Sequence, residues 1–594
     1  MSGNREDTPP LAKPFTASIQ ATFQQGPASY QFAGYGHAIA PQPDSAEANY
    51  TRGSALKEQK RLAQALAAFD RAIALKPDYA EAHNSRGIVL ANFDRLDDAI
   101  AAFDGAIALK PDYAEAYNNR GIVLQDLKRL DDALANFDKA IALQPGNARA
   151  HNNRGVALHD LKRPDDALAS HDKAIALKPD YAEAYYNRGI VLQDLKRLDD
   201  ALADFERAIG LKPNYAPAHN NRGVVLANLN RLDDAIAGFD GAIALKPDDA
   251  EAYNNRGNVL QDLNRLDDAL ANFDKAIALM PDFAEAYSNQ SYCLLKMGRF
   301  EQGWRLHEWR KKTERPVGNR SFQQPLWLGG EDVANRTLFV HWEQGLGDTI
   351  QFCRYGKLLK ARGARVVMSV QEPLHRLLQQ MSPDIEVVSH NEVPAGFDYH
   401  CPLMSLPLAL GTTLQNIPSE KRYIFADEQL RRAWDMRLPP QTKPRIGVVW
   451  RGSPQHRNDR NRSIDLPTLA PLFSADAHWI SLQKELRLGD HALLEAPYKI
   501  VHYGDELKDF SDTAAVLDLL DLVITVDTSV AHLAGAMGKQ VWILLPYKSD
   551  WRWLSDRDDS PWYPTARLFR QDDMHSWKNV IARVRAALRD FVQI

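Results

Sequence analysis

A 34-residue period runs through the first half of this chain and limits the folds that are open to it. Each unit carries two helical patterns and closes with Ala-Ile-Ala-Leu-Lys-Pro or a close variant. A unit of this size cannot bury its apolar face alone, so neighbouring units must stack. The sequence therefore predicts an α-solenoid. The period is clearest in an Arg-Gly pair that begins at Arg52, Arg86, Arg120, Arg154, Arg188, Arg222 and Arg256.

The units resemble tetratricopeptide repeats in their length and in the positions of their small residues. In the third unit, Gly121 and Ala133 are small where two helices would cross closely, and Pro145 would stop the second helix. The resemblance implies a solenoid over residues 47–314, with seven full repeats and a degenerate eighth.

The eighth unit and the segment after it mark a change in organisation. Trp304 and Trp309 stand where earlier units carry small residues, which predicts a cap that docks on a following domain. Residues 315–334 contain prolines and paired glycines and are interpreted as a linker.

An asparagine recurs in one register of the first helix of the units. Asparagine is a poor helix former, so its recurrence calls for a reason. One hypothesis is a groove whose amides grip the backbone of an extended peptide, and a similar ladder is found in the repeat domain of O-linked N-acetylglucosamine transferases. The alternatives are simple copying of an ancestral repeat, or side chains that cap neighbouring helices. The residues are Asn119, Asn153, Asn187, Asn221, Asn255 and Asn289.

Composition excludes several classes of protein. A formal charge of −5 over 594 residues argues against a dedicated nucleic-acid binder. Cys293, Cys353 and Cys401 are too widely spaced for a disulfide framework or a zinc motif, which favours a reducing compartment. No apolar run is long enough to span a membrane, and no signal sequence is recognisable, so the cytoplasm is expected. Residues 1–46, rich in Pro, Gly, Gln, Ser and Ala, are predicted to be a disordered leader.

Short apolar runs alternate with helical patterns after Asn335, which predicts parallel sheets. We expect a shortened Rossmann-like lobe over residues 335–440 and a second lobe, ending in a closing helix, over residues 441–594. The predicted strands are Thr337–Glu343, Ala364–Val370, Ile385–Val388, Phe397–Leu406, Arg445–Trp450, His478–Gln483, Lys499–Tyr503, Leu522–Val526, Val541–Leu545 and Arg567–Phe569.

Three stretches of this α/β part resemble the glycosyltransferase family that includes the lipopolysaccharide heptosyltransferases (family 9-like). They are Glu343–Phe352 (EQGLGDTIQF), Ile446–Ser453 (IGVVWRGS) and Leu522–Pro546. The resemblance implies a GT-B architecture with two Rossmann-like lobes, inverting chemistry without an essential metal or cofactor, and a nucleotide-sugar as the donor substrate.

Asp348 is the candidate catalytic residue. It matches the family's aspartate after the glycine turn, which is proposed to take the acceptor's proton as the acceptor attacks the anomeric carbon. The alternative role is the N-cap of the helix that follows. Gly345 and Gly347 in the same turn would let the backbone approach a substrate closely.

The donor-binding candidates cluster after two other predicted strands. The Asp527 turn falls at the amino end of a helix, where anionic ligands bind, and an arginine-rich loop follows Trp450. A capped helix, a buried histidine and a solvated basic loop are the alternatives. Trp551, Arg552 and Trp553 could stack a base or a sugar, or only pack in the core. The donor-binding set is Gly345, Gly347, Arg451, Ser453, Arg460, Arg462, Gln483, Asp527, Thr528, Ser529 and His532.

Together these features predict a metal-independent, inverting glycosyltransferase whose repeat groove selects the acceptor, a protein or peptide. Two alternatives stay open. In one, the repeats form a protein-interaction scaffold and the transferase lobes are inactive. In the other, the enzyme acts on a glycan or a lipid-linked saccharide.

Overall fold

The computed structural model describes residues 44–314, 320–455, 458–487, 489–495, 498–574 and 576–592. Nearly all of the predicted leader, 1–46, therefore lies outside the described residues. The described chain divides into two compact units, one ending at Arg256 and the other beginning at Gly257. The predicted repeat domain, 47–314, does not coincide with either unit, because the end of the array is grouped with the α/β part.

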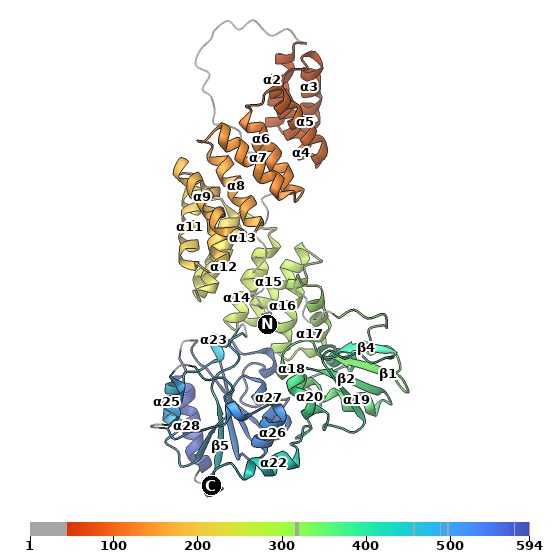
Figure 1. Ribbon diagram of the computed structural model, residues 1–594, viewed down its shortest axis with the longest axis vertical. Helices are drawn as coiled ribbons and strands as arrows, with labels where there is room; N and C mark the ends of the chain where they lie inside the picture. Colours follow the sequence, from red (N-terminus) through yellow and green to blue (C-terminus); the bar gives the residue numbers. More distant parts are fainter. Residues whose placement is uncertain are drawn as a thin grey trace. The chain divides into compact units, whose positions relative to one another are not determined.

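The first unit consists of paired helices (Figure 1). The first helix of each pair has 13 residues and the second has 14. The helices are α2 (Ala46–Glu58), α3 (Leu62–Leu75), α4 (Ala80–Asn92), α5 (Leu96–Leu109), α6 (Ala114–Asp126), α7 (Leu130–Leu143), α8 (Ala148–Asp160), α9 (Pro164–Leu177), α10 (Ala182–Asp194), α11 (Leu198–Leu211), α12 (Ala216–Asn228) and α13 (Leu232–Leu245), with α14 (Ala250–Asp262) crossing into the second unit.

A glycine and an aromatic ring fix how the two helices of a repeat cross. A Cβ atom added at Gly121 in α6 would lie 2.6 Å from the ring of Phe137 in α7. That distance is too short for a carbon contact, so only glycine fits, and the close crossing predicted at Gly121 is confirmed. The ring itself is completely buried.

The fourth repeat breaks this pattern with His171, which replaces the phenylalanine. His171 is completely buried and makes a 3.2 Å hydrogen bond through Nδ1 with Asn152 Oδ1. Burial, assisted by the charges of His159 and Arg188, lowers the pKa of His171 to about 3. The imidazole is therefore neutral in the folded protein at any physiological pH.

Replacing His171 with phenylalanine is expected to reduce acid destabilisation. Between pH 6.5 and pH 3 the unfolded chain binds a proton at His171 that the folded chain does not, so folding stability falls as the pH falls through that window. By pH 5 this loss reaches about 2 kcal/mol, which His171→Phe removes. Urea unfolding at pH 7 and pH 5 measures the difference, with His83→Gln, a half-buried site, as the control. An unchanged pH dependence in His171→Phe would contradict this account.

The second unit starts with the end of the repeat array. Its helices are α15 (Leu266–Leu279), α16 (Ala284–Lys296) and α17 (Phe300–His307), followed by the 3-10 turn η1 (Glu308–Lys311). Trp304 is 1% exposed and lies in the same core as the α/β part, with its ring centroid 5.2 Å from that of Trp551. The predicted cap that docks on the next domain is therefore confirmed for Trp304, whereas Trp309 stacks on Tyr287 within the repeat.

The first sheet has four parallel strands in the order β3-β2-β1-β4. The predicted strand 397–406 is shorter than expected, because Pro402 ends it and the chain turns into η2 (Leu403–Ser405). The predicted helix after Asp348 also divides in two. The elements are β1 (Thr337–His341), α18 (Leu346–Phe352), α19 (Tyr355–Ala361), β2 (Arg365–Val370), α20 (Glu372–Leu378), β3 (Ile385–Ser389), β4 (Tyr399–Pro402) and α21 (Leu406–Ala409).

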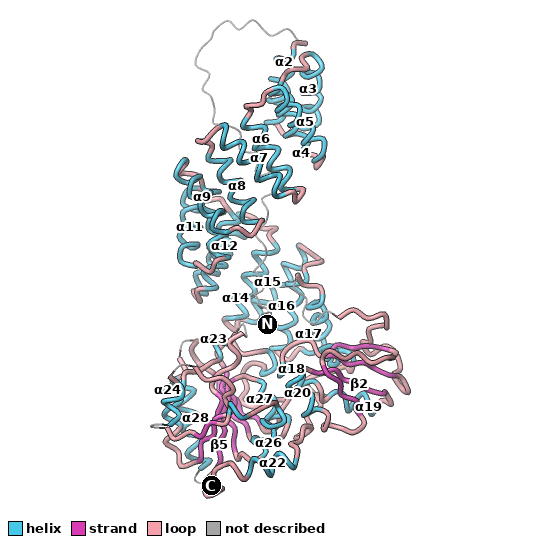
Figure 2. The backbone as a smooth tube through the Cα atoms, viewed as in Figure 1, coloured by secondary structure: helices cyan, strands magenta, loops and turns pink. Residues whose placement is uncertain are grey.

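The second sheet has six parallel strands in the order β10-β9-β8-β5-β6-β7, the order of a doubly wound α/β sheet. Figure 2 shows the two strand groups apart from one another. The elements are β5 (Arg445–Val449), α23 (Asp459–Arg462), α24 (Leu466–Leu469), η3 (Ala470–Leu472), β6 (His478–Ser481), α25 (Asp490–Glu495), β7 (Val501–His502), η4 (Gly504–Glu506), α26 (Phe510–Asp518), β8 (Leu522–Val526), α27 (Ser529–Ala536), β9 (Val541–Leu545), η5 (Trp551–Trp553), β10 (Ala566–Arg570) and α28 (Lys578–Val592).

Strand β8 is buried on both faces, which explains its uninterrupted apolar sequence. Ile524 and Val526 face a core that includes α28, while Val523 faces the core shared with α26 and α27. Helix α22 (Glu428–Asp435), expected in the first lobe, packs on α26, where Trp434 Nε1 donates to Asp512 Oδ1 at 3.0 Å.

The described helices include none that is both long and apolar enough to cross a bilayer.

Candidate functional site

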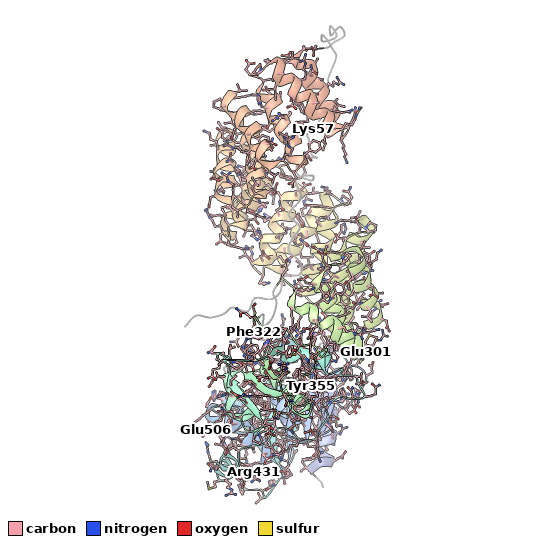
Figure 3. All side chains as sticks on the ribbon, turned by 90° about the vertical axis from the view of Figure 1, so that its right-hand side faces the viewer. Lys57, Glu301, Phe322, Tyr355, Arg431 and Glu506 are labelled. Carbon is pink, nitrogen blue, oxygen red and sulfur yellow. The ribbon has the colours of Figure 1, made fainter. Side chains whose placement is uncertain are left out.

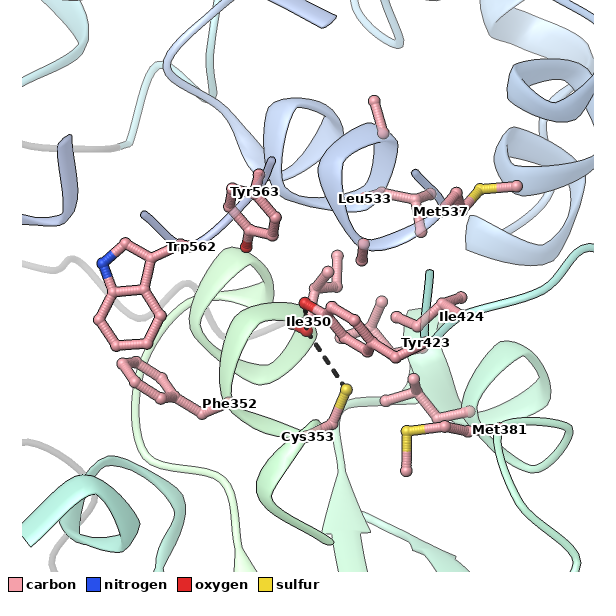
Figure 4. Close-up of a cluster of buried hydrophobic side chains, with 14 of the residues drawn as sticks. Ile350, Phe352, Cys353, Met381, Tyr423, Ile424, Leu533, Met537, Trp562 and Tyr563 are labelled. Carbon is pink, nitrogen blue, oxygen red and sulfur yellow. Dashed lines mark hydrogen bonds between the residues drawn. The ribbon is translucent and has the colours of Figure 1, made fainter. Parts of the chain in front are cut away.

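The helices that follow β1 and β8 pack against one another at the carboxyl ends of the two sheets. A Cβ atom added at Gly347 in α18 would lie 2.8 Å from Cδ2 of His532 in α27. Gly347 therefore lies against His532, and its predicted approach to a substrate stays a prediction. Behind it, Ile350 and Leu533 belong to a shared apolar cluster with Tyr563 (Figure 4).

Asp348 holds the start of α18 and also binds an arginine from the other sheet. Its Oδ2 accepts from the N–H of Gly345 at 2.8 Å, and its Oδ1 accepts from the Arg552 guanidinium. Arg552 donates to Asp550 Oδ1 at 2.8 Å as well. Burial raises the pKa of Asp348, an effect that the Arg552 charge opposes. The N-cap residue of α18 is therefore Gly345 and not Asp348 as predicted; Asp348 is the third residue of the helix, and its carboxylate caps the Gly345 N–H while it lies beside a buried cation.

Arg462 lies against the Asp527 turn. Its Nη1 donates to the backbone carbonyl of Asp527 at 2.8 Å, and its guanidinium sits so close to Gly452 that a side chain there would collide with it. Burial and the charge of Asp550 raise the pKa of Asp527 to about 6, with Arg462 opposing. The structure thus brings together Asp527 and Arg462, two of the predicted donor-binding residues, at the point where the strand order of the sheet reverses.

Thr528 and Ser529 begin α27 as predicted. The Thr528 hydroxyl lies 3.2 Å from that of Thr525, and Thr528 is 8% exposed. Ser529 is half-buried at the first position of the helix.

His532 is a buried neutral ring. Its Nδ1 lies 2.9 Å from the Tyr563 hydroxyl, and the imidazole stacks on Trp553 with centroids 5.2 Å apart. Burial, reinforced by Arg552, lowers the pKa of His532 to about 3. Near neutral pH it brings no positive charge to a phosphate, and its packing matches the buried-histidine alternative.

The structure shows Arg451 and Gln483 in contacts within the protein. Arg451 is 7% exposed and pairs with Asp490 at 2.5 Å and with Asp465 at 2.7 Å, so two carboxylates already neutralise its charge. Gln483 Oε1 accepts from the backbone N–H groups of Trp450 and Arg451. Both side chains thus hold the loop after β5, and their donor-binding role stays a prediction. Ser453 is exposed on that loop and Arg460 is exposed in α23, and their role stays a prediction.

The structure also corrects the predicted role of the recurring asparagines. Asn119 and Asn255 are 1% and 2% exposed, so neither offers its amide to a peptide. Each side-chain amide donates to a side chain of the preceding repeat, 35 residues earlier, and this ties neighbouring repeats together. The bonds are Asn119 to Asn84, Asn153 to Asn118, Asn187 to Asn152, Asn221 to Tyr186 and Asn255 to Asn220, at 3.0–3.3 Å. Asn289 is half-buried in α16.

The sequence did not predict that the segment after β9 would contribute a buried cation to the candidate site. Arg552, 7% exposed, joins Asp348 to Asp550, while Trp551 and Trp553 are buried in the core and do not offer a stacking face. The same strand-end rule that selected Asp527 could have selected Arg552, since it follows the neighbouring strand by a short loop.

The loop after β9 also contacts the last full repeat. Lys548 Nζ pairs with Asp262 Oδ2 at 2.8 Å, and the Tyr547 hydroxyl donates to the Leu263 carbonyl at 3.4 Å. In the eighth repeat, burial raises the pKa of Tyr292, whose surroundings include Arg552 and Asp550. The end of the repeat array therefore packs against the segment after β9 that carries Arg552.

Comparison with known families establishes the class of the first half. Two models described as "Tetratricopeptide repeat" match residues 38–114, 118–182, 182–215 and 250–283, and a model described as "TPR repeat" matches residues 228–264. The helix pairs are therefore tetratricopeptide repeats, and they precede two parallel α/β sheets.

Individual relatives share part of the chain. Protein FlbA of Caulobacter vibrioides is 26% identical over 325 residues, which cover 50% of this chain and 54% of FlbA, so the chain spans about half the length of that relative. The structure of YrrB, described as a TPR protein with an unusual peptide-binding site, is 28% identical and covers 31% of this chain and 95% of its own, with a TM-score of 0.26. A structure of MamA is 27% identical and covers 27% of this chain and 94% of its own, also with a TM-score of 0.26.

Proposed function

We propose that the repeats form a scaffold that holds an extended, basic segment of a partner protein. The observation that carries this proposal is a row of carboxylates at the ends of successive first helices, which we call the acid row: Asp126, Asp160 and Asp194. Gln125 donates to Asp160 at 3.0 Å, and His159 lies 2.9 Å from Asp194. These bonds hold the carboxylates at the spacing of the repeats, and Asp126 and Asp194 are exposed.

Neutralising the acid row is expected to weaken the binding of basic peptides. The triple variant Asp126→Asn, Asp160→Asn, Asp194→Asn should bind an Arg/Lys-rich peptide at least about tenfold more weakly, since each lost charge pair contributes a fraction of 1 kcal/mol. Fluorescence anisotropy with a peptide panel at low salt measures the affinity.

The matched control neutralises three exposed aspartates at the starts of second helices, Asp131, Asp165 and Asp199. This control changes the net charge of the chain by the same amount. Equal weakening in both triple variants, or no peptide binding by the unaltered protein, would contradict a role for the acid row.

A second function is favoured by the convergence of charged groups at the carboxyl ends of the two sheets. We infer that the second unit transfers a sugar from a nucleotide-sugar donor to the held partner. Support comes from the pairing of Asp348 with Arg552, from Arg462 beside Asp527, and from the resemblance of the surrounding motifs to the heptosyltransferase family.

In this proposal Asp348 takes the proton of the acceptor nucleophile as it bonds to the anomeric carbon, and the bond from that carbon to the diphosphate oxygen breaks. Arg462 and the amino end of α27 receive the negative charge of the leaving diphosphate. Arg552 holds Asp348 in place and keeps it ionised.

A further inference from the structure

Six arginines form a regular ladder along the repeats. In the first helix of each repeat from the second to the seventh, an arginine pairs with an acidic residue 16 positions earlier, in the preceding repeat. Only 23–30% of each arginine side chain is exposed, so each one fills a slot between three helices. The pairs are Arg86–Asp70, Arg120–Asp104, Arg154–Asp138, Arg188–Asp172, Arg222–Glu206 and Arg256–Asp240.

The eighth repeat has lost the arginine but kept the acid. Gln290 stands in the arginine position and donates to Asp274 at 2.6 Å, again across 16 residues. Glutamine is shorter than arginine and uncharged, so the slot is only partly filled. A hollow of about 320 Å³ remains there, lined by Asp274, Gln290 and the apolar side chains of Leu270, Leu294 and Leu306.

The lining matches the shape and charge of an arginine side chain. Three leucines would cover its methylene stem, and the Asp274 carboxylate stands where its counterparts bind a guanidinium. Leu306 takes the place that Asn136 has in the third repeat, where Asn136 accepts from Arg120 at 2.8 Å. Asp274 is therefore the main anchor for a charged group in the hollow.

The remaining charged groups at the hollow have partners elsewhere. Arg299 pairs with Asp267 at 3.5 Å, and Arg305 pairs with Glu301 at 3.1 Å. Glu301 projects from α17 (Figure 3) and is 74% exposed. These carboxylates offset the two rim arginines, and within the described ranges the hydrogen bond given to Asp274 comes from the neutral amide of Gln290.

We propose that this hollow binds an arginine side chain presented by a partner protein. The bound side chain would form a seventh arginine–acid pair, with Asp274 as the acid and the arginine supplied by the partner. The site differs from the acid row and from the candidate transferase site, so it does not depend on either function proposed above.

Saturation-transfer NMR on the full chain tests the proposal with N-acetyl-arginine methylamide as the probe. The isosteric citrulline derivative, which lacks the charge, is the control ligand. We expect saturable binding of the arginine probe at millimolar concentration and at least tenfold weaker binding of citrulline. No saturable signal, or equal binding of the two probes, would overturn the proposal.

Two variants locate the binding. Gln290→Arg fills the slot with the chain's own side chain and should abolish probe binding while raising the melting temperature, since it completes the ladder. Asp274→Asn preserves the volume but removes the charge and should weaken binding at least tenfold. Asp248→Asn, an exposed site in the turn before α14, is the matched control. Unchanged binding in either Gln290→Arg or Asp274→Asn would show that the probe binds elsewhere.

Discussion

Replacing Arg552 with methionine is expected to lower the free energy of unfolding of the second unit by about 3–5 kcal/mol. Arg552 is 7% exposed and its guanidinium binds both Asp348 and Asp550. Methionine has a similar length but leaves the mostly buried Asp348 and the partly exposed Asp550 without their cation. Breaking such a group costs much more than losing an exposed pair.

Urea unfolding followed by tryptophan fluorescence measures this loss, because Trp551 and Trp553 flank the substituted residue. The matched control is Arg305→Met in α17, where the arginine side chain is 70% exposed and pairs only with Glu301. The control should change stability by less than about 1 kcal/mol. The double variant Arg552→Met, Asp348→Asn should recover part of the loss, since Asp348 no longer brings a buried charge. If the stability losses of the two single variants simply add in the double variant, Arg552 and Asp348 are not directly coupled.

Replacing Asp348 with asparagine is expected to lower sugar transfer by about 10²- to 10⁴-fold, the usual contribution of a positioned general base. The substitution is conservative in shape. Asparagine keeps an oxygen that can accept from the Gly345 N–H, so the start of α18 should persist. What is lost is the ability to take a proton.

The donor is identified first, by thermal-shift screening of the unaltered protein against nucleotide-sugars. A donor at 100 times its dissociation constant should stabilise the fold by about 2.7 kcal/mol. Transfer is then measured as donor-dependent release of nucleoside diphosphate. Asp348→Asn should retain the thermal shift and lose the release.

The control is Asp559→Asn, which removes an exposed carboxylate that pairs with Arg557. It should retain both the shift and the release. If no donor stabilises the unaltered protein, the transferase proposal is wrong and the scaffold remains. If a donor binds but Asp348→Asn still turns over, the assignment of the base is wrong and the transferase proposal survives.

The repeats and most strands could be predicted because their signals are local. Strands β8 and β9 have the predicted bounds, since an apolar run flanked by polar residues and glycine leaves little choice of ends. Strand β4 was overestimated, because apolar residues continue past Pro402 into a buried 3-10 turn that has the same composition. Composition alone cannot separate a buried strand from a buried turn.

The site was predicted less completely because its chemistry depends on pairing. Arg451 and Arg462 lie in one basic loop and look equivalent in the sequence. In the fold Arg451 is neutralised by Asp465 and Asp490, whereas Arg462 reaches the Asp527 turn. The asparagines illustrate the same limit, since their register was recognised but their partners in the preceding repeat were not.

The sequence by itself determined the repeat class, the sites of close helix crossing and the presence of parallel sheets. Each of these depends on residues within a few helical turns or on the period of apolar side chains, so the pattern is visible along the chain. Only the tertiary structure decided that Asp348 meets Arg552, 204 residues later, and that Asp274 has lost its arginine. The chemistry of a buried charged side chain depends on the partner that it contacts. Which partner that is depends on how segments distant in the sequence pack together.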